Sequence, residues 1–94
     1  MFERNATHFI IKGRVQGVGF RWWACGQARA FALSGWVRNR TDGNVEILAI
    51  GNEAALRGFA AACRRGPQAA HVREVEENPG EDDGSDGFDE LPTV

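Results

Sequence analysis

Residues 7–35 read THFIIKGRVQGVGFRWWACGQARAFALSG, and the start of the fold is decided in this stretch. Apolar and polar residues alternate over 7–15, which predicts a strand that turns Phe9 and Ile11 toward a core. The opposite face of this strand carries His8, Ile10 and Lys12. A glycine-rich turn, Gln-Gly-Val-Gly, follows at 16–19.

Residues 20–34 are predicted to form an amphipathic helix, because apolar residues recur there at spacings of three and four. These residues are Phe20, Trp23, Ala24, Ala28 and Phe31. Gly35 stands where a helix commonly ends in a glycine. The tryptophans at 22, 23 and 36 are interpreted as packing residues.

A hairpin and a second helix come next. Strands are predicted at 36–40 and 44–50, because Asp42-Gly43 between them is a strong turn signal. The second strand points Val45, Ile47 and Ala49 inward. Asn52 is expected to cap a second helix that Gly66-Pro67 ends. One face of this helix carries Leu56, Phe59, Ala60 and Cys63.

The last third of the chain is less regular. A fourth strand is predicted at 71–77, but Val72 and Val75 do not share a period of two, which indicates a bulge or another register. Residues 78–87 form a polar, acidic loop that is expected to be mobile. Phe88 and Leu91 then return as a short edge strand.

The order of elements is β-α-β-β-α-β, the α+β arrangement known as the ferredoxin-like split βαβ. We therefore expect two helices on one face of an antiparallel sheet, with strand order 4-1-3-2 and any last strand at an edge. The 94 residues suit a single domain, 1–94.

Charge divides the chain into a basic body and an acidic tail. Residues 1–73 hold 11 basic and 4 acidic residues, a net +7, whereas 74–94 hold 9 acidic and no basic residues. A basic body favours an anionic ligand.

Cysteine content and hydropathy bear on location. Cys25 and Cys63 are expected to be two buried thiols in a reducing compartment, with a disulfide between the helices as the alternative. No apolar run is long enough to cross a bilayer. The first residues, Met1 to Asn5, lack the layout of a signal peptide. The expectation is a cytoplasmic protein without membrane association.

The turn at 16–21 is the first candidate site. Successive backbone N–H groups of Gln16, Gly17, Val18, Gly19 and Phe20 can form a nest for an anion, and a helix N-terminus adds partial positive charge. Arg21 follows in the first helical turn, where its planar fork can bind two phosphate oxygens. The alternative is a plain strand-to-helix connection with a surface arginine.

Asn39 is the second candidate. In a split βαβ sheet the first two strands are parallel, with the third strand between them, so their carboxyl ends lie at the same end of the sheet, about 10 Å apart. An arginine and an asparagine can reach across that gap to one phosphate. An asparagine that only supports the neighbouring turn is the alternative.

Taken together, GRVQGVGFR at 13–21 and GWVRNRTDGNVE at 35–46 resemble the two signatures of the acylphosphatase family. The resemblance implies that Arg21 and Asn39 are catalytic and that the backbone of Gln16 to Phe20 binds the phosphate. It implies a hydrolase that splits acyl phosphates into a carboxylate and inorganic phosphate. A monomer is expected, although the sequence carries no signal for the oligomeric state. Water would attack phosphorus in line, with no metal or cofactor. Inorganic phosphate or sulfate would bind at the same place.

Two other functions are weighed. One is a non-catalytic acylphosphatase-like module that only binds phosphate. The other is a nucleic-acid-binding ferredoxin-like domain, which would stack bases on aromatic residues of its central strands. The strand at 44–50 has no aromatic residue and the acidic tail opposes a polyanion, so nucleic acid is not expected as a partner.

Overall fold

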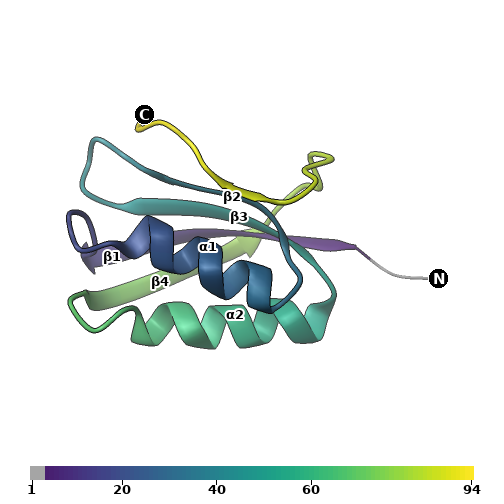
Figure 1. Cartoon of the computed structure of the whole chain (residues 1–94), viewed down its shortest axis with the longest axis horizontal. Coiled ribbons are helices and arrows are strands. Elements are labelled where there is room, and N and C mark those ends of the chain that lie inside the picture. The colour runs from purple at the N-terminus through teal and green to yellow at the C-terminus, as the bar shows by residue number, and fades with distance from the viewer. Residues whose placement is uncertain (1–3) are drawn as a thin grey trace.

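A five-stranded sheet, with two helices on one of its faces, makes up residues 4–94 of the computed structural model (Figure 1). The structure describes residues 4–94. Residues 1–3, which belong to the predicted domain and to the N-terminal segment that was compared with a signal peptide, lie outside the described residues. The elements are β1 (Asn5–Arg14), α1 (Phe20–Ala30), β2 (Ser34–Asn39), β3 (Val45–Gly51), α2 (Glu53–Arg65), β4 (His71–Pro79) and β5 (Phe88–Glu90).

The strand order is β4-β1-β3-β2-β5, which confirms the predicted 4-1-3-2 core and the edge strand. Strand β3 runs antiparallel to both β1 and β2, so β1 and β2 are parallel and their carboxyl ends lie at the same end of the sheet. The expectation of a wholly antiparallel sheet is wrong in one respect, because β5 pairs in parallel with β2. The connection between the end of β4 and the start of β5 is long enough for β5 to pair with β2 in either direction.

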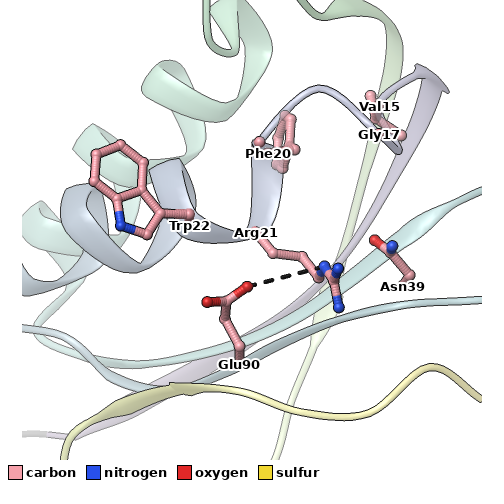
Figure 2. Close-up of a pocket in the computed structure, with 8 residues that line it drawn as sticks. Val15, Gly17, Phe20, Arg21, Trp22, Asn39 and Glu90 are labelled. Atoms are coloured by element: carbon pink, nitrogen blue, oxygen red, sulfur yellow. Dashed lines mark ion pairs between the residues drawn. The ribbon is translucent and has the colours of Figure 1, made fainter.

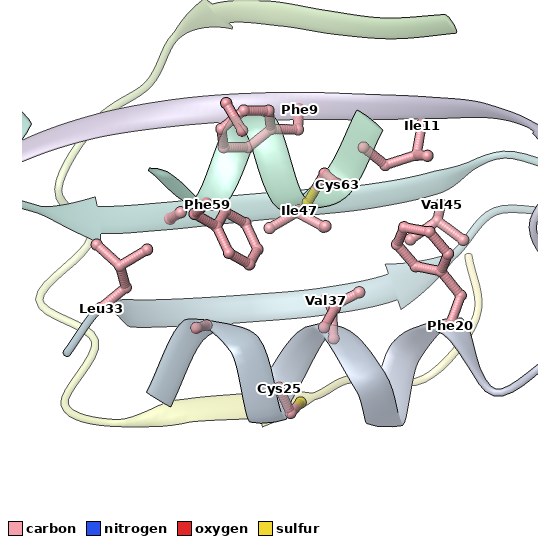
Figure 3. Packing of buried hydrophobic residues seen from close by; sticks show 14 of the residues in the cluster. Phe9, Ile11, Phe20, Cys25, Leu33, Val37, Val45, Ile47, Phe59 and Cys63 are labelled. Atoms are coloured by element: carbon pink, nitrogen blue, oxygen red, sulfur yellow. The ribbon is translucent and has the colours of Figure 1, made fainter. Parts of the chain in front are cut away.

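The core fills the space between the sheet and the helices (Figure 3). Phe9, Ile11, Val37 and Ile47 point inward as the alternation predicts, and each is fully buried. Phe59 of α2 packs edge-on against Phe9, with ring centroids 5.7 Å apart. Such aromatic pairs stabilise the folded state beyond the apolar area they bury.

Both cysteines are free and buried, which confirms the interpretation as thiols rather than a disulfide. Burial raises the pKa of the Cys63 thiol to about 12. The thiolate is the reactive form of cysteine, so this side chain is chemically quiet at neutral pH.

The first helix ends earlier than predicted, at Ala30 rather than at 34. Ala32 takes the left-handed conformation, with φ of 57°. Its N–H donates to the Arg29 carbonyl at 3.0 Å, and the Leu33 N–H donates to the Ala28 carbonyl at 2.9 Å. These two bonds close the helix in the way that usually requires glycine. Alanine at that position hid the helix end from the sequence analysis.

Gly35 therefore does not end a helix and instead lies in β2. Its φ is +135°, and a Cβ there would lie 1.9 Å from the Leu48 carbonyl oxygen of β3. Only glycine lets the two strands approach this closely. Gly35 thus fixes how β2 lies against the centre of the sheet.

The fourth strand contains the bulge that the sequence left open. Lys12 pairs with Glu74 and Gly13 with Val72, so Arg73 is the extra residue. The strand also runs on to Pro79, so the first two residues of the predicted 78–87 loop are paired with β1.

The rest of that loop crosses the sheet face that the helices leave open. Gly80 lies against the side chain of Leu48, and Trp36 Nε1 donates to Asp83 Oδ2 at 3.2 Å. Arg4 Nε lies 2.8 Å from Asp82 Oδ2. Acids of the tail thus pair with bases of the body. Whether the loop is mobile stays a prediction.

Neither helix of the described chain combines the length and apolar character that crossing a membrane requires.

Replacing Gly35 by alanine should lower the free energy of unfolding by about 2–4 kcal/mol, because the new Cβ meets backbone and the φ is unfavourable. Denaturant unfolding measures this. Gly26→Ala is the matched control: its Cβ has open space within α1, and alanine is the better helix former, so we expect a gain of about 0.5–1 kcal/mol. Equal stability of the two variants would contradict the account of β2.

Candidate active site

The loop between β1 and α1 is shaped by two glycines. Gly17 and Gly19 have φ of 73° and 78°, which L side chains rarely adopt. Gly19 is the N-cap of α1, and within residues 4–94 no side-chain cap accepts a hydrogen bond from the first turn, which contains no acidic residue. The N–H groups that begin the helix are therefore available to an anion.

Arg21 and Asn39 line one pocket with this loop (Figure 2). The pocket has a volume of about 220 Å³, below the roughly 300–1,000 Å³ of sites for drug-sized ligands. Its lining consists of Val15, Gly17, Gly19, Phe20, Arg21, Trp22, Asn39 and Glu90. Among the described residues, that lining holds one cationic side chain, Arg21, and one anionic side chain, Glu90, so the case for a small anion rests on Arg21 together with the N–H groups that begin α1.

Gln16 and Val18, also predicted to bind substrate, do not line the pocket. Gln16 Nε2 instead donates to the carbonyl oxygens of Arg40 at 2.7 Å and Asn44 at 2.8 Å. These bonds tie the glycine-rich loop to the hairpin that follows Asn39. Val18 packs partly buried against the core.

Asn39 lies two residues after the buried Val37, on the same face of β2, as the alternation predicts. Its carbonyl oxygen accepts from the Val94 N–H at 3.1 Å, which fixes the backbone. The side-chain Oδ1 is buried and has no donor within residues 4–94. A buried amide oxygen without a donor costs about 1–3 kcal/mol. Asn39 thus offers a free acceptor beside the anion pocket.

The side chains of the two arginines next to Asn39 bind Glu46 and do not line the pocket. Arg38 Nε and Arg40 Nη1 lie 2.7 and 3.0 Å from Oε1 of Glu46, and His8 Nε2 lies 2.6 Å from its Oε2. Burial alone would raise the pKa of Glu46, but the hydrogen bonds from Arg38, His8 and Arg40 outweigh it and lower the pKa to about 2. This cluster lies on the open sheet face and fixes the strand on both sides of Asn39.

The sequence analysis missed three residues of the pocket, Val15, Trp22 and Glu90. Glu90 Oε1 lies 3.9 Å from Arg21 Nε. The interpretation of Trp22 as a packing residue is wrong, because it is 77% exposed at the pocket. Trp23 does pack, edge-on against Phe20. Helical spacing already puts Trp23, and not Trp22, on the apolar stripe, so the signal was present. To predict Glu90 as a pocket residue, one would have had to know where β5 lies in the sheet.

The sequence profile described as Acylphosphatase matches residues 7–90. A protein named Acylphosphatase from Acidiphilium cryptum (strain JF-5) is 49% identical, covering 88% of this chain and 91% of its own. The crystal structure of acylphosphatase from Bacillus subtilis superposes with a TM-score of 0.90 at 38% identity, over 95% of this chain and 99% of that one. Full-length HypF, solved in a phosphate- and nucleotide-bound form, matches with a TM-score of 0.92 at 25% identity, over 99% of this chain but 12% of HypF.

The Glu46 cluster predicts a pH-dependent part of the stability. Because its pKa falls from 4.5 to about 2 on folding, ionised Glu46 stabilises the fold fully above pH 4.5 and loses this effect as the pH drops toward 2. The shift corresponds to about 3 kcal/mol at neutral pH. Unfolding of Glu46→Gln from pH 7 to 2.5 should show a deficit of that order that shrinks as the pH falls.

Glu53→Gln serves as the control for Glu46→Gln, because Glu53 is exposed and, among the residues that the structure describes, pairs only with Arg57 one helical turn away. Its stability should follow that of the unmodified protein at every pH. A Glu46→Gln deficit that stays constant with pH would contradict the lowered pKa.

Proposed function

This chain belongs to the acylphosphatase family and hydrolyses acyl phosphates, and on that premise we propose that the pocket at the start of α1 is its active site. One observation carries the proposal. Arg21 and Asn39, from two separate elements, line a single small pocket with the glycine-rich loop.

The phosphate is bound by charge and by backbone donors. Arg21, the second residue of α1, directs its guanidinium into the pocket, and its fork matches two phosphate oxygens. The uncapped N–H groups at the start of α1 and those of the loop residues that line the pocket, Gly17, Gly19 and Phe20, complete the cradle. Inorganic phosphate and sulfate would occupy the same place as competitors.

Asn39 positions the attacking water by accepting one of its hydrogens at the free Oδ1. The water oxygen bonds to phosphorus while the bond from phosphorus to the acyl oxygen breaks. The carboxylate departs with that electron pair, and both water protons end on the inorganic phosphate. A carboxylate is a good leaving group, so positioning and charge stabilisation account for the rate.

The reaction needs neither a metal nor a cofactor in this proposal. Between Arg4 and Val94, no group of three His, Cys, Asp or Glu side chains is arranged to hold a metal ion. The leaving group makes Lewis-acid activation dispensable. Hydrolysis by the unmodified protein in excess EDTA tests this part.

The proposed form is one domain acting as a monomer in the cytoplasm. Two free, buried thiols suit a reducing compartment.

The two alternatives fit less well. Relatives named Acylphosphatase match over most of their length, which favours the hydrolase over a module that only binds phosphate. On the open sheet face, Trp36 is engaged by Asp83, a carboxylate, which disfavours the stacking of a nucleic-acid base there.

Arg21→Ala should lower kcat/KM for acetyl phosphate at least a hundred- to thousandfold, about 3–5 kcal/mol, because the transition-state charge loses its partner. Arg21→Lys should recover little, since an ammonium cannot bind two oxygens at once. Phosphate release measures the rate. Arg57→Ala, which removes a surface arginine of α2, should leave it unchanged. Near-normal turnover in either Arg21 variant would remove this residue from the reaction.

Asn39→Ala should act on the chemistry more than on binding. Losing the water contact should lower kcat by about 2–4 kcal/mol, equivalent to roughly 30- to 1,000-fold. Inhibition by inorganic phosphate reports binding alone, and it should change by less than about threefold. Asn44→Ala is the control, because within the described part of the chain its side chain hydrogen-bonds only to Asp42 in the same hairpin. A stable Asn39→Ala protein with full kcat would refute the water-positioning role.

A further inference from the structure

Glu90 brings a negative charge into a pocket that is otherwise suited to anions. It shares a face of β5 with Phe88, which is buried beneath the helices, so alternation points Glu90 toward the start of α1. Its carboxylate lies 3.9 Å from Arg21 Nε, and the side chain is 44% exposed. Asp89, between them, belongs to the opposite face and is exposed. Only one of the two adjacent acids therefore reaches the pocket.

The position of Glu90 within the pocket decides what it can contact. In Figure 2 the Arg21 guanidinium lies between the Glu90 carboxylate and the Asn39 amide. In an in-line displacement, the leaving oxygen lies on the side of phosphorus opposite the water. If Asn39 holds the water, as the proposed function has it, the acyl group extends toward Glu90. The indole of Trp22 points away from the guanidinium, so it does not screen Glu90 from the acyl group. Among the described residues that line the pocket, Glu90 is the charged side chain besides Arg21.

We propose that Glu90 selects the substrate by the charge of its acyl group, favouring acyl groups that carry a cation, such as an ammonium, over neutral ones and over those that carry a carboxylate. This selection rests on the proposed active site. Attraction between unit charges about 6 Å apart amounts to roughly threefold in affinity at the dielectric constant of water, and to roughly a hundredfold at the effective value near a protein surface. Added salt should weaken it, because the site is partly exposed.

Stable phosphonates test this without hydrolysis. Propylphosphonate, 3-aminopropylphosphonate and 3-phosphonopropionate share a phosphonate and a short chain, and differ in a neutral, cationic or anionic end. Calorimetric titration should give the tightest binding for the amine and the weakest for the carboxylate, spanning at least about threefold. In Glu90→Gln the three affinities should fall within about twofold of one another. Asp89→Asn, which removes the neighbouring charge, should keep the original order.

Each other result has a definite meaning. Uniform tightening of all three ligands in Glu90→Gln would show that Glu90 only competes for Arg21, and would overturn acyl selection. An unchanged order in Glu90→Gln would overturn it as well. Arg21→Ala separates the two proposals: if it binds all three phosphonates normally, the active-site assignment fails, whatever Glu90 does. With selection correct, the spread among the ligands in the unmodified protein also shrinks at high salt, which a merely structural role would not produce.

Discussion

The close contact between β2 and β3 is the constraint on which the site depends. Gly35 lies against the Leu48 carbonyl, where no other residue fits, and this sets how β2 sits beside the sheet centre. Strand β3 is antiparallel to both neighbours, so the carboxyl ends of β1 and β2 lie at the same end of the sheet. The loop before Arg21 and the strand end bearing Asn39 meet there. Two residues from separate elements therefore share a pocket because of sheet topology.

A second set of contacts holds the two parts of the site in register. The Gln16 side chain bonds carbonyls on both sides of the hairpin, and Glu46 binds Arg38 and Arg40 on either side of Asn39. Because Glu46 occupies those two arginines on the open face, Arg21 is left as the cation of the pocket. Preorganised groups of this kind stabilise a transition state without rearranging.

Local sequence signals predicted what depends on local structure. Alternation placed Phe9 in the core, and Asn52 caps α2 through the Ala55 N–H at 2.7 Å. The end of α1 was missed because Ala32 adopts a conformation that glycine usually signals. Glu90 was missed because its place follows from a long connection across the sheet, which no local pattern encodes. Arg21 and Asn39 were predicted to share a site from the family resemblance and from the parallel strands that end at the same end of the sheet, and both line one pocket.

The pocket, as proposed, directs water to phosphorus rather than to the acyl carbon. Hydrolysis of acetyl phosphate in ¹⁸O-labelled water, with mass spectrometry of both products, distinguishes these two positions of attack. If water attacks phosphorus, the label appears in inorganic phosphate and the acetate stays unlabelled. Label in the acetate would mean attack at the carbonyl carbon, and would contradict the arrangement of Arg21 and Asn39 around a phosphoryl group.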